Sequence, residues 1–214
     1  MEADFWHQRW AKGEIGFHEK HINPLLIQYF SNLKLAQKSR IFVPLCGKTH
    51  DISWLLKQGY SVVGAELSEL AIKELFSQLG LEPKISKLGE SLLYKGPNID
   101  IVVGDIFTLT SHQLAKVDAV YDRAALVALP APMRVQYSQL IRTLTKHAPQ
   151  LLICFNYEQT AMDGPPFSVV EHDIKQYYGQ YYHCELLYSG ALIGGLKGRI
   201  DALQQVWLLQ NSDA

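Results

Sequence analysis

The strongest constraint on how this chain folds is an alternation of short apolar runs with helical patterns, which extends from residue 40 to residue 157. The apolar runs are nearly continuous, as in "RIFVPL" and "YSVVGAE". Strands of this kind are typical of a parallel sheet that helices cover on both faces. We therefore predict an α/β fold with a doubly wound, mostly parallel sheet. The expected strands lie at residues 40–45, 60–66, 99–105, 117–123 and 150–157.

Helix signals occupy the segments between these strands. Ser68 is placed to cap the start of a helix, and Gly59 and Gly80 are placed just after helix ends. Pro24 suits the first position of a helix nearer the N-terminus. The expected helices of the alternating region and the segment after it lie at residues 50–58, 67–79, 131–147 and 171–182.

The two ends of the chain depart from this alternation. Residues 4–36 are aromatic and helical in pattern. Residues 183–190 and 202–209 have the pattern of two strands joined by a glycine-rich segment, which predicts an antiparallel hairpin at one edge of the sheet. No repeat or linker divides the chain. We predict a single domain over residues 1–214, in which residues 1–36 form an N-terminal helical extension or lid.

The composition is that of an ordinary globular protein and argues against several classes of function. The 214 residues are 48% apolar and 19% charged, with a formal net charge of −1. No basic face is evident, so nucleic acid is not expected as a partner. No apolar run is long enough to span a bilayer, so no membrane association is expected. The first residues lack the apolar core of a secretory signal, and we predict a cytoplasmic protein.

The cysteine usage agrees with that compartment. Cys46, Cys154 and Cys184 are odd in number and none forms a C-x-x-C pair, so a disulfide framework is not expected. Cys46 lies beside the first strand-to-helix turn. We expect it to be a buried structural thiol, because free cysteine packs as a small hydrophobe.

The turn after the first strand, "PLCGKTHD", has the final G-K-T of a phosphate-binding loop but not its first glycine, because Phe42 stands at that position. The dinucleotide pattern G-x-G-x-x-G is absent as well. Glu66 nevertheless ends the second strand, where an open α/β fold presents a carboxylate to the hydroxyls of a ribose. A ribose-binding acid without a pyrophosphate site predicts a nucleoside cofactor without phosphates, and S-adenosylmethionine is the common one. The alternative is that Glu66 caps the next helix.

Two further strand ends carry candidate binding residues. Asp105 is placed to accept a hydrogen bond from the amine of an adenine, and Ile106 to pack on the ring; the alternative is a solvated turn acid beside a core isoleucine. Arg123 ends the fourth strand and is suited to the carboxylate of the cofactor's amino-acid part. The alternative for Arg123 is a salt bridge to Asp122 or Glu66.

The N-terminal segment is unusually aromatic. Trp6 and Trp10 are four residues apart and share one helix face, and Phe17 follows in a loop. Such rings are suited to cover a cationic sulfonium, although packing alone is the alternative. His18 is a candidate general base, and the alternative is a structural role. Its spacing from His21 is typical of metal ligands, but no further ligand completes a site and no metal is expected.

Several motifs together carry a resemblance to a known family. The N-terminal W-x-x-x-W and G-F-H, "PLCGK", "SVVGAELSELAI", "YDRAALVALP" and "GPPF" resemble the thiopurine S-methyltransferases, the bacterial members more than the animal ones. The likeness covers roughly residues 5–170. It implies a class I methyltransferase fold, S-adenosylmethionine as cofactor, a monomer, and methylation of aromatic and heterocyclic thiols including thiopurines. Bacterial relatives are also associated with selenium and tellurium species.

The resemblance also assigns roles to individual positions. The C-terminal quarter matches weakly, and Arg199 is not aligned with any acceptor-binding residue. Animal members differ where Asp105 stands here, which leaves the chemistry of that contact open. The implied contacts are Trp10, with Trp6 near it, and Leu45 against the cofactor, Glu66 at the ribose, Asp105 and Ile106 at the adenine, Arg123 at the methionine end and Phe17 at the acceptor pocket.

The expected mechanism is in-line displacement on a small-molecule thiol that the enzyme positions in a dry pocket. No catalytic base is assigned, because aromatic thiols ionise readily; Arg123 is a possible assist, since its charge lowers the pKa of a nearby thiol. Three alternatives stay open from the residues alone: an NAD(P) oxidoreductase, a non-catalytic nucleoside sensor, and methyl transfer to nitrogen or oxygen. The glycine-rich residues 190–198 are expected to form a mobile cover over the acceptor pocket.

Overall fold

A nine-stranded sheet runs through the protein in the order β3-β4-β5-β2-β1-β6-β7-β9-β8. The computed structural model describes residues 3–211, so both ends of the predicted domain lie outside the described part. The five strands from β5 to β7 pair in parallel, as predicted. The strands are β1 (Arg40–Pro44), β2 (Ser61–Glu66), β3 (Lys84–Leu88), β4 (Ser91–Gly96), β5 (Ile99–Val103), β6 (Ala119–Arg123), β7 (Gln150–Asn156), β8 (Tyr182–Ala191) and β9 (Leu203–Asn211).

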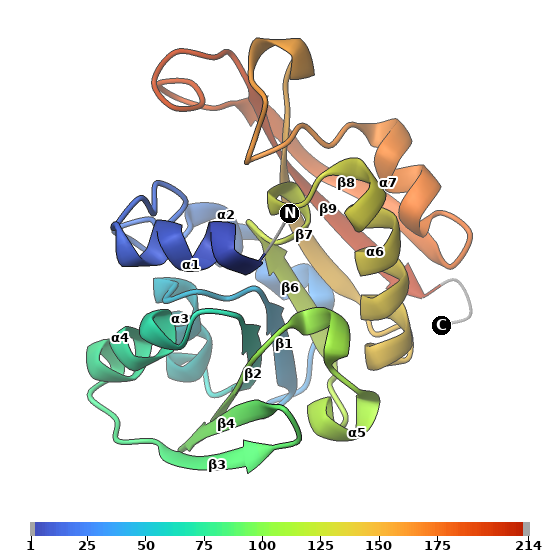
Figure 1. Ribbon diagram of the computed structural model, residues 1–214. Coiled ribbons are helices and arrows are strands. Elements are labelled where there is room, and N and C mark those ends of the chain that lie inside the picture. The colour runs from blue at the N-terminus through green and yellow to red at the C-terminus, as the bar shows by residue number, and fades with distance from the viewer. Residues whose placement is uncertain (1–2, 212–214) are drawn as a thin grey trace.

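Helices cover both faces of the sheet (Figure 1). One apolar core joins the sheet to α2, α3 and α4, and a second joins it to α5, α6 and α7. None of the helices between residues 3 and 211 is long and apolar enough to cross a membrane. The helices are α1 (Ala3–Ala11), α2 (Pro24–Tyr29), α3 (His50–Lys57), α4 (Glu69–Leu79), α5 (Ser111–Leu114), α6 (Ala131–Thr145) and α7 (Glu171–Tyr178), with short 3-10 turns η1 (Phe30–Leu33), η2 (Ile106–Thr108), η3 (Leu126–Ala128) and η4 (Gln159–Ala161).

Alternation along the strands explains how one sheet serves two cores. In β1, Phe42 belongs to one core, whereas its neighbours Ile41 and Val43 belong to the other. Successive side chains of a strand point to opposite faces, so a strand that is covered on both faces must be apolar at every position. This requirement is the physical origin of the continuous apolar runs in the sequence.

The predicted capping residues are confirmed. Ser68 Oγ accepts from the backbone N–H of Ala71 at 3.3 Å, and Gly80 closes α4 with φ of 66°. Asn23 caps α2 by accepting from the N–H of Leu25 at 2.9 Å, and Pro24 fills the first helical position. Each cap satisfies a backbone group that the helix itself leaves unpaired.

The C-terminal hairpin is confirmed, with β9 paired antiparallel to both β7 and β8. The helix predicted over residues 171–182 is four residues too long, since α7 ends at Tyr178 and β8 begins at Tyr182. Tyr182 is 2% exposed and belongs to the core with α6 and α7. Its burial as the first residue of a strand outweighs the helical pattern of the preceding tyrosines.

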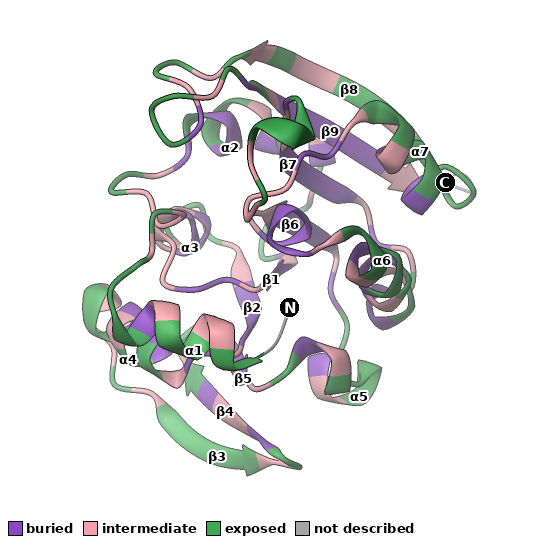
Figure 2. Ribbon diagram, turned by 45° about the horizontal axis from the view of Figure 1, so that its top comes forward, coloured by how far each residue is buried: buried purple, intermediate pink, exposed green. Residues whose placement is uncertain are grey.

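The edges of the fold differ from the predicted pattern in two places. An antiparallel pair, β3 and β4, extends the sheet beyond β5 and was not predicted. Figure 2 shows β3 exposed along nearly its whole length, so it lacks the apolar run that marked the buried strands. The N-terminal segment is not helical throughout: residues 12–23 form a loop between α1 and α2. Gly13, with φ of 68°, lies in that loop, in a conformation that glycine adopts readily.

Candidate active site

A cavity of about 500 Å³ lies at the carboxyl ends of β1, β2, β5 and β6. In open parallel sheets this is the edge where ligands bind. Helix α1 and the loop after it cross this end of the sheet (Figure 1). Both contribute residues to the lining of the cavity. The structure brings all the predicted binding residues together around it, although their roles remain predictions. These residues are Trp10, Phe17, Leu45, Glu66, Asp105, Ile106 and Arg123.

The turn after β1 has an unusual backbone. Leu45 and Gly47 both have positive φ, at 44° and 51°. For leucine this conformation costs energy, and such residues concentrate at functional sites. A Cβ on Gly47 would lie 3.1 Å from Cζ2 of Trp10, so the glycine lets that indole approach the turn. Cys46 is buried as predicted, and burial raises the pKa of its thiol well above the usual value, which makes it unreactive.

Glu66 connects this turn to the next helix. One carboxylate oxygen accepts from the N–H of Gly47 and the other from the N–H of Ser68, both at 2.8 Å. The side chain is buried, and burial raises its pKa. The alternative interpretation, in which Glu66 caps the next helix, therefore describes part of its role. Each carboxylate oxygen has a second lone pair, so Glu66 keeps acceptor capacity for a ligand in the cavity.

The end of β5 has the features of its alternative interpretation, a solvated turn acid beside a core isoleucine, and both residues also line the cavity. Asp105 is exposed and accepts from the N–H of Phe107 at 3.0 Å, which starts η2. Ile106 is 4% exposed and belongs to a core, yet it also lines the cavity. An exposed carboxylate beside an apolar surface is suited to a heterocycle with a polar edge.

Arg123 does not pair with Asp122 or Glu66, which was the alternative to a role in binding. Its guanidinium forms an ion pair with the carboxylate of Glu19 and donates to the carbonyl of Phe17 at 3.2 Å. Asp122 is buried on the other face of the strand, where it accepts from the hydroxyl of Tyr137 at 2.7 Å. Desolvation raises the pKa of Asp122 to about 6. Arg123 therefore attaches the N-terminal loop to the sheet.

Aromatic rings form the cover of the cavity. Phe17 lies edge-on to both Trp6 and Trp10, with ring centroids 5.7 and 5.5 Å apart. His18 lines the cavity beside them, and burial, followed by the nearby charge of Lys48, lowers its pKa. His18 is therefore neutral near pH 7. Within residues 3–211, no three His, Cys, Asp or Glu side chains converge to hold a metal.

Further parts of the cavity lining come from connections, most of which the sequence analysis did not assign. Met133, Pro165, Pro166, Leu192 and Leu196 contribute mainly apolar surface. Of these, Leu192 and Leu196 lie in the segment that was predicted to cover the acceptor pocket, whereas Met133 and the two prolines of the "GPPF" motif had no predicted role. The strand pattern gave no signal for them, because they lie in loops and at a helix start.

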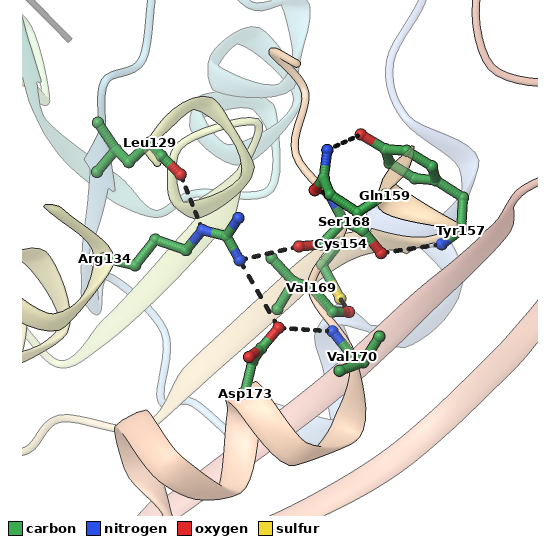
Figure 3. Close-up of polar contacts among 9 residues, drawn as sticks. All are labelled: Leu129, Arg134, Cys154, Tyr157, Gln159, Ser168, Val169, Val170 and Asp173. Atoms are coloured by element: carbon green, nitrogen blue, oxygen red, sulfur yellow. Dashed lines mark hydrogen bonds and ion pairs between the residues drawn. The ribbon is translucent and has the colours of Figure 1, made fainter. Parts of the chain in front are cut away.

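Figure 3 shows the buried arginine that ties two of these connections together. Arg134 is 4% exposed, and its guanidinium donates to the carbonyls of Leu129 and Ser168, each at 2.8 Å. Asp173 lies 3.7 Å from it and balances its charge. Leu129 and Pro166 both line the cavity, so Arg134, together with the hydrogen bond from the N–H of Phe167 to the carbonyl of Val127, joins two segments of the lining.

The glycine-rich segment reaches the cavity through Leu192, Leu196 and Lys197. Leu196 is 7% exposed and packs in a small core of its own with Tyr157 and Ala202. At the tip, Ile193 is 98% exposed. The segment thus borders the cavity as predicted, while its mobility stays a prediction.

The model of the family "Thiopurine S-methyltransferase" matches residues 1–204. The chain belongs to this family. A thiopurine S-methyltransferase of Xanthobacter autotrophicus is 48% identical over 213 residues, covering 99% of this chain and 100% of the relative. A second, from Teredinibacter turnerae, is 49% identical over 212 residues, covering 99% of each.

A solved structure of a methyltransferase has a similar fold. The crystal structure of 1,6-didemethyltoxoflavin-N1-methyltransferase from Burkholderia thailandensis, solved with S-adenosylhomocysteine, has a TM-score of 0.66 to this chain at 13% identity, covering 98% of this chain and 87% of that one. At this identity the likeness concerns the fold alone. Taken with the family, it makes the chain an S-adenosylmethionine-dependent methyltransferase, as predicted, and not a nicotinamide-dependent oxidoreductase.

Proposed function

We propose that this enzyme methylates the sulfur of aromatic and heterocyclic thiols, including thiopurines. The observation that carries the proposal is that the cavity combines charged side chains at the strand ends, those of Glu66, Asp105 and Arg123, with apolar side chains from the connections around it. These apolar side chains suit a planar, weakly polar acceptor. The names of the relatives support sulfur as the accepting atom.

The residues at and near the strand ends fit the cofactor. Glu66 would bind the ribose hydroxyls with its remaining acceptor sites, and Asp105 with Ile106 would hold the adenine. Arg123 would take the methionine carboxylate, while Leu45 and Trp10 would pack along the cofactor. Support comes from the close approach that Gly47 allows and from a volume of about 500 Å³, within the range of small-molecule sites.

When bound, S-adenosylmethionine supplies a methyl group on a positively charged sulfur. The task of the chain is to align the thiol behind that methyl group and to exclude water. The rings of Trp6, Trp10 and Phe17 exclude water, and Phe17 borders the acceptor. Neutral His18 is able to take the thiol proton, and the charge of Arg123 favours the thiolate. No residue is required as a strong base.

The proposal extends to selenium and tellurium species, whose soft anions would use the same dry pocket. It also retains the predicted cytoplasmic location and monomeric state. Methyl transfer to nitrogen or oxygen is the competing function.

A radiolabelled methyl-transfer assay tests the proposal. The enzyme would be given labelled S-adenosylmethionine with 6-mercaptopurine or thiosalicylate, and with hypoxanthine or salicylate as matched acceptors that carry oxygen in place of sulfur. We expect label only on the thiols, with mass spectrometry placing it on sulfur. Label on nitrogen or oxygen would contradict the proposal, and cofactor binding without transfer to any acceptor would indicate a sensor.

A further inference from the structure

A pair of opposite charges lines the cavity at the end of β6. Glu19, from the loop after α1, and Arg123, from the strand, form an ion pair, and both line the cavity. The side chain of Arg123 is 11% exposed and that of Glu19 is 41% exposed. The carboxylate therefore remains accessible from the cavity side, whereas the guanidinium is nearly buried.

The position of this pair matches one end of the proposed cofactor. Glu66 ends β2 and Arg123 ends β6, with β1 between them. Neighbouring strands lie about 4.8 Å apart, so the two strand ends are separated by about 10 Å. A nucleoside with its ribose at Glu66 and an amino-acid chain on its 5′ position spans that gap. Its α-carbon would then lie beside Arg123 and Glu19.

An α-amino acid carries a carboxylate and an ammonium group on one carbon. Arg123 can pair only with the carboxylate, and a desolvated ammonium left without an acceptor is costly. Among the described residues that line the cavity, three carry carboxylates: Glu19, Glu66 and Asp105. Glu66 and Asp105 end β2 and β5, which are farther along the sheet, so Glu19 is the carboxylate at this end.

We infer that Glu19 binds the α-ammonium group of S-adenosylmethionine while Arg123 binds its α-carboxylate. The inference rests on the proposed function and adds a cofactor-binding residue to it. The four charges alternate in sign, so the ligand's two groups each meet an opposite partner while Glu19 and Arg123 stay adjacent. Charge-assisted hydrogen bonds of this kind are the stronger ones in proteins.

A buried network holds Glu19 ready for this role. The side-chain amide of Asn23 donates to Glu19 at 3.3 Å, and its backbone N–H donates to Asp51 at 2.8 Å. Asp51 in turn accepts from the hydroxyl of Tyr121 at 2.9 Å. Asn23 and Asp51 are each 1% exposed. The loop carboxylate is thereby connected to α3 and β6, which limits its freedom before the ligand arrives.

Calorimetric titration with three probes tests the inference. The probes are S-adenosylhomocysteine, its deaminated analogue that keeps the carboxylate, and 5′-methylthioadenosine, which has no amino-acid part. Glu19→Gln should weaken S-adenosylhomocysteine by about tenfold to a hundredfold, because an ion pair is lost. The same variant should bind the other two probes within about twofold of the wild type. Glu14→Gln, an exposed change in the same loop, is the matched control and should alter none of them.

Two results would overturn the inference. Unchanged affinity for S-adenosylhomocysteine in Glu19→Gln would remove Glu19 from the site. Equal weakening of S-adenosylhomocysteine and its deaminated analogue would mean that Glu19 only orients Arg123. If Glu19→Gln fails to fold, Glu19→Asp is titrated instead. Because this variant keeps a carboxylate, the inference requires it to bind S-adenosylhomocysteine more tightly than the deaminated probe. A wild-type protein that binds none of the probes would instead refute the cofactor site itself, and this inference with it.

Discussion

The two halves of the cavity are built in different ways. The proposed cofactor half is centred on strand ends, to which α1 and the loop after it add Trp10 and Glu19. The parallel pairing of β2, β1 and β6 fixes where Glu66 and Arg123 lie relative to one another. The proposed acceptor half consists of connections. Two of them are joined by the side chain of Arg134 and by the backbone N–H of Phe167, which donates to the carbonyl of Val127 at 2.7 Å. The first half is therefore a property of the fold, while the second depends on a few long-range contacts. The predictions below test that difference.

The largest effect is expected at the cofactor half. Glu66→Ala should weaken binding of S-adenosylhomocysteine by about 1.5–3 kcal/mol, the range of hydrogen bonds to charged groups. Calorimetry measures this change, and Glu82→Ala, at an exposed position, is its control. The KM for the thiol in the remaining activity should stay unchanged. Unaltered cofactor affinity would remove Glu66 from the ribose site.

Asp122 tests whether every buried strand-end carboxylate belongs to the site. Its pKa is raised to about 6 by burial, against about 3.9 in an unfolded chain. The folded state thus holds the proton more tightly, and this residue's contribution to stability falls as pH rises from about 4 to 6 and is level above. As the pH rises from about 4 to 6, the unfolding free energy of Asp122→Asn should therefore increase by about 2 kcal/mol relative to that of the wild type.

Urea unfolding of both proteins at several pH values measures this difference. Cofactor affinity should not change in Asp122→Asn, because Asp122 faces the core with Tyr137 and not the cavity. A loss of cofactor binding without loss of stability would place Asp122 in the site after all.

A smaller effect is expected at the acceptor half. Arg134→Lys keeps the charge beside Asp173 but cannot donate to the carbonyls of both Leu129 and Ser168 in the same way. We expect the KM for the thiol to rise about fivefold to tenfold, roughly 1–1.4 kcal/mol. Steady-state kinetics measures it, with the dissociation constant of S-adenosylhomocysteine as internal control. A variant that weakens the cofactor instead would contradict the division into halves.

The smallest effect concerns the glycine-rich segment. Residues 190–198 should exchange amide hydrogens quickly in the free enzyme, since the tip at Ile193 is fully exposed. A bound thiol should slow this exchange by about threefold, whereas the cofactor alone should not. Hydrogen-exchange mass spectrometry measures the exchange rates with the thiol and with the cofactor alone. Slow exchange with and without ligand would rule out a mobile cover.

The same contrast explains what could be predicted from the sequence. The parallel strands were predictable because burial on both faces requires continuous apolar runs. The positions of Glu66 and Arg123 at the edge of the sheet were predictable because each residue ends such a run. The exposed strand β3 gave no such signal. Arg134 and Ser168 are 34 positions apart, and Arg123 and Phe17 are 106 apart. No local pattern encodes those contacts, so the partner of Arg123 and the acceptor walls required the structure.

The separation of the two halves is tested most directly by a double-mutant cycle. Cofactor affinity and thiol KM would be measured for wild type, Glu66→Ala, Arg134→Lys and the double variant. We expect each single change to act on its own parameter, with the effects adding to within about 0.5 kcal/mol, as for residues without shared partners. A coupling above about 1 kcal/mol would contradict the account, because it would show that the strand ends and the loops form one binding unit.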